Sequence, residues 1–166
     1  MSEHPLLEAD QILRALLDAN VRFVLIGGLA AQVHGSPSLT GDVDVCFDLD
    51  RENLDRLAEA VQSLAAIRRE LPPGVHAPLD ARALRAGDVF TLTTRFGDLD
   101  LLAHPDPGLD FEALAKRSIA AEILGVVVRV AGLDDLIAMK RAAGRPKDRV
   151  ELEILGALRE ELDARS

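Results

Sequence analysis

The stretch that decides the fold is residues 21–47, VRFVLIGGLAAQVHGSPSLTGDVDVCF. Its first six residues are rich in β-branched and aromatic side chains and run straight into Gly27-Gly28, which predicts a short buried strand ending in a turn. The alanine-rich residues 29–33 predict a short helix, which the following glycine and proline end. In residues 42–47, polar and apolar side chains alternate, which predicts a second strand with one buried face.

The carboxylates of Asp42 and Asp44 are the sharpest chemical feature of this second strand. Residues two apart on a strand point to the same face, with their Cα atoms about 7 Å apart. Two unpaired carboxylates at that distance repel each other, so that one of them takes up a proton or binds a cation. Oxygen ligands suit Mg²⁺ or Mn²⁺. The pair alone is at least equally compatible with a solvated strand face at the edge of a sheet.

A later hairpin offers a third carboxylate. Residues 89–94 and 98–103 predict two strands joined by a tight turn, and Asp98 and Asp100 alternate with leucines in the second strand. If this strand lies beside residues 42–47, three acids from neighbouring strands form a metal-binding triad of the kind used in phosphoryl transfer. Asp100 interrupts an apolar run, whereas Asp98 suits a turn position. The choice between them depends on the strand register.

Two further features favour phosphate binding. Glycine at Gly27 and Gly28 lets the backbone approach a phosphate, and the helix behind them supplies N–H donors, although the same pair also occurs in turns that serve packing only. In a chain of net charge −9, five cations fall within ten residues: Lys140, Arg141, Arg145, Lys147 and Arg149. They suit phosphate binding. They equally suit a solvated helical face near a helix end.

The remaining segments predict an α+β domain. Apolar residues recur at helical spacing in five segments: 6–19, 51–66, 111–116, 132–140 and 146–162. Two β-rich segments lie at 121–124 and 126–130, and the composition of residues 72–87 predicts an irregular stretch. Hairpins together with a crossover favour a small mixed β-sheet flanked by helices. We expect a core over residues 1–131 and a C-terminal helical pair over residues 132–166 that packs on it.

Length and composition narrow the classes of protein. The 166 residues suit one domain with a sizeable core. The chain has 28 acidic and 19 basic residues, and this acidity argues against broad attraction to nucleic acid. The absence of Trp and Tyr argues against a platform of aromatic side chains that stack on bases. The single cysteine excludes an internal disulfide. We expect a cytoplasmic protein with no membrane partner, since no apolar run reaches about 18 residues and the first residues lack a secretory signal pattern.

Several motifs resemble those of the DNA polymerase β-like nucleotidyltransferase superfamily. Residues 27–35, GGLAAQVHG, followed by residues 40–44, TGDVD, are similar to its glycine turn and aspartate pair. Residues 97–102, GDLDLL, look like its third-acid strand. Residues 135–140, DLIAMK, with residues 144–148, GRPKD, look like the C-terminal signature of its minimal bacterial branch, the AbiEii/AbiGii-type proteins.

This resemblance implies transfer of a nucleoside monophosphate from a nucleoside triphosphate to an acceptor hydroxyl, with Mg²⁺ or Mn²⁺ as cofactor. The metal-binding and catalytic residues that it implies are Asp42, Asp44 and Asp100. The nucleotide-binding residues that it implies are Gly27, Gly28, Lys140 and Lys147. The two lysines either face phosphate or pack the helical tail onto the site.

The acceptor and the partners stay open at this level. RNA, a protein or a small molecule could accept the nucleotide. Relatives include toxins of toxin–antitoxin pairs, which implies a cognate antitoxin protein as a partner. The loop before the aspartate pair, Ser36-Pro37-Ser38-Leu39, lacks the arginine that relatives usually carry there. The alternative hypothesis is therefore a catalytically degenerate protein of the same fold that acts as a nucleotide- or partner-binding module.

Overall fold

The structure is a computed structural model, and it describes residues 5–165. Its strands are β1 (Phe23–Ile26), β2 (Asp42–Phe47), β3 (Ile67–Arg68), β4 (Val89–Thr94), β5 (Gly97–Leu102), β6 (Ile119–Ile123) and β7 (Val126–Val130). Its helices are α1 (Ala9–Asp18), α2 (Gly27–Val33), α3 (Arg51–Ser63), α4 (Ala81–Ala86), α5 (Phe111–Arg117), α6 (Leu133–Ala143) and α7 (Pro146–Arg165).

The strands form one seven-stranded mixed sheet in the order β3-β4-β5-β2-β1-β7-β6. The central strand β2 pairs antiparallel with β1 and parallel with β5. Its register with β5 places Asp42 opposite Asp98 and Asp44 opposite Asp100. The expected α+β class, a mixed sheet flanked by helices, is therefore confirmed, and the third-acid strand lies directly beside the aspartate pair.

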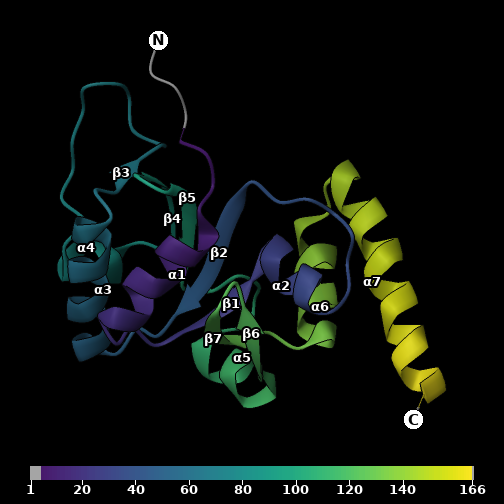
Figure 1. The fold of residues 1–166 in the computed structure, drawn as a ribbon. Coiled ribbons are helices and arrows are strands. Elements are labelled where there is room, and N and C mark those ends of the chain that lie inside the picture. Colours follow the sequence, from purple (N-terminus) through teal and green to yellow (C-terminus); the bar gives the residue numbers. More distant parts are fainter. Residues whose placement is uncertain (1–4, 166) are drawn as a thin grey trace.

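Helices cover both faces of the sheet (Figure 1). The alternation in β2 buries Val43, Val45 and Phe47 completely, and α1 contacts β2 and α3. On the other side, α2 contacts β2 and α6, and α6 lies between α2 and α7. Asp42 and Asp44 lie on the opposite face of β2, so the alternation separates the core residues of this strand from its candidate site residues.

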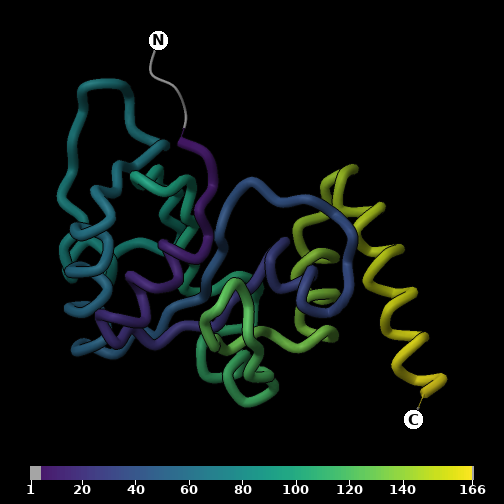
Figure 2. The backbone as a smooth tube through the Cα atoms, in the orientation of Figure 1, coloured from purple at the N-terminus to yellow at the C-terminus, as the bar shows by residue number. Residues whose placement is uncertain are grey.

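The connection between α2 and β2 passes close to the last helix, α7, which also packs against α6. It runs past α6 and α7 before it turns back into β2 (Figure 2). The Gln32 Nε2 donates to the carbonyl oxygen of Ser38 at 2.8 Å, which holds the connection onto α2. A side chain at Gly35 would lie 3.2 Å from Leu158 of α7. Leu155 of α7 is completely buried, so this helix contributes to the core.

The prediction of an irregular segment over residues 72–87 is wrong in its last third. Residues 81–86 form α4, whose N-terminus is capped because the Asp80 carboxylate accepts from the Ala83 N–H at 2.8 Å. The short strand β3 was not expected either, because two residues give no periodic signal. Helix α2 begins at Gly27 and thus includes both glycines, which were expected to lie in a turn.

The division into a core over residues 1–131 and a helical pair over 132–166 stays a prediction, and residues 1–4 and 166 of those ranges lie outside the described part. Within residues 5–165, none of the helices combines the length and apolar character that crossing a bilayer requires.

Candidate active site

Three carboxylates meet where β2 lies beside β5. One oxygen atom from each of Asp42, Asp44 and Asp100 lies within 4.8 Å of the other two, and all three residues are half-buried. The parallel pairing of β2 with β5 creates this cluster, because it aligns two strands that each carry an acid at every second position. The chain therefore concentrates three acidic groups, all offering oxygen ligands, in one small volume.

The middle carboxylate of this cluster is costly to ionise. Burial, together with the negative charges of Asp42 and Asp100, raises the pKa of Asp44 to about 8. Burial also raises the pKa of Asp100, against the opposing hydrogen bond from Arg69. Without a cation in the cluster, the neutral form of Asp44 is favoured near neutral pH. A divalent cation would relieve this repulsion, so the electrostatics suit a metal site.

The glycine pair at the start of α2 is required by close contacts. Gly27 has a φ of +71°, and a Cβ there would collide with the Asp44 side chain. A Cβ at Gly28 would lie 2.7 Å from the Cβ and Oγ1 of Thr40. Larger residues would push α2 away from the carboxylates. The two glycines thus bring the first turn of α2 directly against the acidic cluster.

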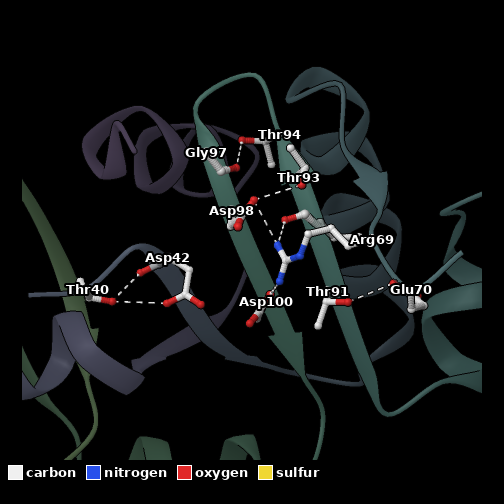
Figure 3. Close-up of polar contacts among 11 residues, drawn as sticks. Thr40, Asp42, Arg69, Glu70, Thr91, Thr93, Thr94, Gly97, Asp98 and Asp100 are labelled. Carbon is white, nitrogen blue, oxygen red and sulfur yellow. Dashed lines mark hydrogen bonds and ion pairs between the residues drawn. The ribbon is translucent and has the colours of Figure 1, made fainter. Parts of the chain in front are cut away.

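Hydrogen bonds hold the outer carboxylates in place (Figure 3). The Thr40 hydroxyl lies 3.2 Å from the backbone oxygen of Asp42 and 3.3 Å from its carboxylate. On the opposite side, the Arg69 Nη2 donates to the Asp100 Oδ1 at 2.7 Å. The Arg69 Nη1 lies 3.2 Å from the Asp98 Oδ1, which also accepts from the Thr93 hydroxyl at 3.0 Å. Arg69 therefore fixes the orientation of Asp100.

The register separates the roles of Asp98 and Asp100, which sequence alone left open. Asp100 joins the cluster with Asp42 and Asp44, whereas Asp98 lies two residues earlier in β5 and is bound to Arg69 and Thr93. Asp98 still lines the pocket above the cluster. The geometry thus makes Asp100 the third carboxylate.

Basic residues around the junction of α6 and α7 face the acidic cluster across a pocket. Lys140 Nζ lies 3.3 Å from the Asp148 Oδ1, and the Arg145 Nε donates to the Asp148 Oδ2 at 2.8 Å. The Asp148 side chain is only 1% exposed, and the hydrogen bond from Arg145 is the main cause that lowers the pKa of Asp148 to about 2. Lys140 and Arg145 are thus held in position by a buried acid, which joins the start of α7 to the end of α6.

A pocket of about 520 Å³ separates the acids from these cations, and we call it the polar pocket. Its acidic wall carries Asp42, Asp44, Asp98 and Asp100, and its cationic wall carries Lys140, Arg145 and Lys147. Gly28 and the loop before β2 close one end. Of the sequence-predicted site residues, all but Gly27 line this pocket, and Gly27 lies beneath Asp44.

Two residues of the site were not singled out from sequence. Arg69 lies 31 positions from Asp100 in the chain, and no local pattern connects the two. Asp148 stood out only as the one acid in the basic segment, and its burial between two cations is visible in the structure alone. The sequence position of Asp148 could have indicated its role, because an acid flanked by cations is a candidate for an ion pair.

No protein-family model and no curated protein sequence matches the chain. Solved structures do match its fold. The lincomycin-bound lincosamide antibiotic adenylyltransferase LnuA superimposes with a TM-score of 0.62 at 11% identity, covering 92% of this chain and 99% of that one. A proposed nucleotidyltransferase from Thermotoga maritima gives a TM-score of 0.55 at 17% identity over 97% and 98% of the two chains.

A third match is ANT(2'')-Ia in complex with adenylyl-2''-tobramycin, with a TM-score of 0.54 at 19% identity over 94% of this chain and 95% of that one. These similarities cover nearly the whole of each chain. At such low identity they establish the fold, and this chain therefore has the fold of nucleotidyltransferases.

Proposed function

We propose that the protein is a metal-dependent nucleotidyltransferase that moves a nucleoside monophosphate from a nucleoside triphosphate to an acceptor hydroxyl. The observation that carries the proposal is the polar pocket, in which a cluster of three carboxylates faces Lys140, Arg145 and Lys147. The nucleotidyltransferase fold of the chain supports it. Neither the carboxylate cluster nor the group of cations is specific alone. Transfer of a nucleotide needs a cation site and a phosphate site together, and the pocket offers residues suited to both.

The carboxylates fit a hard divalent cation such as Mg²⁺ or Mn²⁺. Their donors are all oxygen atoms, they lie within 4.8 Å of one another, and burial together with mutual repulsion raises the pKa of Asp44. Asp42, Asp44 and Asp100 would hold the ion. When bound, such an ion supplies neutralisation of phosphate charge and lowers the pKa of a coordinated hydroxyl.

The residues of this chain would bind and orient the two substrates. Lys140, Arg145 and Lys147 would bind the phosphates, and the backbone at Gly27 and Gly28 would let the triphosphate approach the carboxylates. The acceptor oxygen forms a bond to the α-phosphorus, while the bond from that phosphorus to the β-phosphate oxygen breaks. Pyrophosphate leaves, and the hydroxyl proton is released to water. Arg69 and Thr40 hold Asp100 and Asp42 in place during this exchange.

The test is thermal unfolding of wild type and Asp44→Asn with ATP, GTP, CTP and UTP, each with and without Mg²⁺. We expect a Mg²⁺-dependent rise in melting temperature for wild type that the variant loses, because its neutral amide cannot replace a carboxylate ligand. Transfer from an α-labelled nucleotide should fall by more than about 100-fold in the variant. Full transfer by Asp44→Asn would refute the proposal, and Asp18→Asn, at the exposed end of α1, is the matched control.

One observation favours a second candidate, a nucleotide-binding module without transfer. Residues 38–41 line the polar pocket without a cation, and the Leu39 side chain there is 96% exposed. Binding of a nucleotide without turnover would support this candidate. A toxin role with a cognate antitoxin partner, of the AbiEii/AbiGii type, and a cytoplasmic location stay predictions from sequence.

A further inference from the structure

A second pocket adjoins the acidic cluster on its other side, and we call it the apolar pocket. Its volume is about 270 Å³, and it shares Asp44, Asp100, Lys140 and Arg145 with the polar pocket. Apart from these four and Gly27, it is lined by apolar side chains only, among them Ile26, Ala31, Leu102, Leu136, Met139 and Ala143. The carboxylates therefore stand between a charged compartment and an apolar one.

The apolar pocket is unsuited to phosphate. Its two cations are the ones that Asp148 already holds, at 3.3 Å for Lys140 and 2.8 Å for Arg145. The third cation of the cationic wall, Lys147, lines the polar pocket alone. Placing a charged phosphate against aliphatic side chains costs free energy that no additional partner offsets. The triphosphate therefore belongs in the polar pocket.

The apolar pocket is also a poor match for a whole nucleoside. Its volume lies just below the range of about 300–1,000 Å³ that complete ligand sites occupy. A nucleobase carries hydrogen-bonding edges, and the polar side chains of this lining are the four shared with the polar pocket, three of which are already ion-paired. A flexible residue such as Met139 adapts well to an aliphatic or otherwise apolar group. The pocket thus has the size and chemistry of a subsite for one part of a molecule.

We propose that the apolar pocket binds an apolar group of the acceptor, which is a small molecule that carries this group near its reacting hydroxyl. The inference rests on the proposed function, because the hydroxyl must reach the carboxylates that both pockets share. A molecule seated among Ile26, Leu136 and Met139 lies directly beside Asp44 and Asp100. The end of an RNA chain would instead bring ribose hydroxyls and phosphate against apolar walls.

The experiment uses methyl, propyl, butyl and hexyl β-D-glucosides as probes, since each combines sugar hydroxyls with an alkyl chain of known length. Saturation-transfer NMR titrations measure their affinities for the full chain, first without nucleotide. Two variants separate the pocket from the surrounding surface. Ala143→Leu fills the apolar pocket from an exposed position near the end of α6, whereas Ala142→Leu adds the same side chain at its exposed neighbour, which does not line the pocket.

We expect the affinity of wild type to rise about four-fold for each added methylene until the pocket is full. Ala143→Leu should lose this dependence on chain length, and Ala142→Leu should keep it. Equal affinities for all four glucosides in wild type would overturn the inference, as would identical behaviour of the two variants. It would also be overturned if Ala143→Leu weakened binding of a nucleoside triphosphate with Mg²⁺ and left the glucosides unaffected, because the pocket would then belong to the nucleotide.

The binding titrations do not depend on turnover, so the two proposals fail separately. Length-dependent glucoside binding that Ala143→Leu removes, together with no response to any nucleotide, would refute the proposed function and leave the apolar binding site established. A Mg²⁺-dependent nucleotide response with no length dependence would refute the apolar subsite and leave the proposed function standing.

Discussion

Asp44 and Asp148 both line the polar pocket, and their surroundings are opposite. Asp44 lies among other carboxylates, and burial and repulsion raise its pKa to about 8. Asp148 lies between Arg145 and Lys140, and their hydrogen bonds lower its pKa to about 2. The same residue type is thus hard to ionise on one wall of the pocket and stabilised in its ionised form on the other.

The difference indicates that the Asp44 carboxylate is suited to binding a ligand, whereas the Asp148 carboxylate stabilises the fold. Burial of Asp44 and repulsion by its neighbours reduce the free energy of unfolding once the group is ionised, which is typical of groups at functional sites. The Asp148 network joins α6 to α7 and positions two cations without leaving its own acid unpaired. Four predictions test this contrast.

The largest expected effect on stability comes from Asp44→Asn in the presence of EDTA. Between the ordinary pKa of 3.8 and the folded value of about 8, the folded protein holds a proton that the unfolded chain has lost. The free energy of unfolding of wild type therefore falls as pH rises through this window, and the variant escapes that loss. Urea unfolding should show the variant more stable at pH 8, on the order of 5 kcal/mol. Equal stabilities at pH 8 would contradict the contrast.

Asp148→Ala should have the next largest effect, in the opposite direction. The substitution removes the acceptor of three side-chain donors, from Lys140 and Arg145, and leaves these cations without their partner. We expect a loss of about 2–3 kcal/mol at pH 7 by urea unfolding. Glu153→Ala, at an exposed acid on α7, is the control and should change stability little. A loss no greater than that of the control would show that the network does not stabilise the junction.

The decrease in the free energy of unfolding at acidic pH should depend on Asp148. Because its folded pKa is about 2 against an ordinary 3.8, its contribution is complete above pH 4 and is lost as pH falls through 2. Its size is about 2 kcal/mol. The stability difference between wild type and Asp148→Asn should therefore shrink as pH falls from 5 to 2. A difference independent of pH over this range would argue against a paired carboxylate.

Arg69→Met is expected to have the smallest effect, and it tests the acidic wall through the affinity of its carboxylates for Mg²⁺. Arg69 is a cation 2.7 Å from Asp100 and competes with a metal for that carboxylate. Its removal should lower the Mg²⁺ concentration at the midpoint of a thermal-shift titration several-fold, or about 1 kcal/mol. Arg69→Lys should restore the wild-type midpoint. Arg68→Met breaks a 2.6 Å ion pair with Glu70 and is the control, and the same shift there would count against a specific role for Arg69.

Local pattern predicted the acidic wall well. The alternation in residues 42–47 and around Asp98 and Asp100 gave the strands and the face of each carboxylate. The choice of Asp100 over Asp98 required the pairing of β2 with β5, because a shift of two residues in this pairing would place Asp98 opposite Asp44. Sequence pattern describes single strands, whereas the register between distant strands is set by packing of the whole sheet.

The parts that sequence missed are those that depend on long-range contacts. Arg69 reaches the site because β3 pairs with β4 and β4 pairs with β5, and two-residue strands leave no periodicity to detect. Helix α4 had a local signal, an Asp80 cap before an alanine-rich run, which the preceding prolines and glycine obscured. The apolar pocket had none, because its lining comes from β1, α2, β5 and α6 together.

The order of synthesis sets when the polar pocket can exist. Its walls come from three stretches of chain that a ribosome makes far apart in time: residues 28–44, residues 98–100 and residues 140–151. A nascent chain that has folded only through β7 carries the acidic wall without Lys140, Arg145 and Lys147. The polar pocket is therefore complete only once residues 140–151 have been made, after every strand of the sheet.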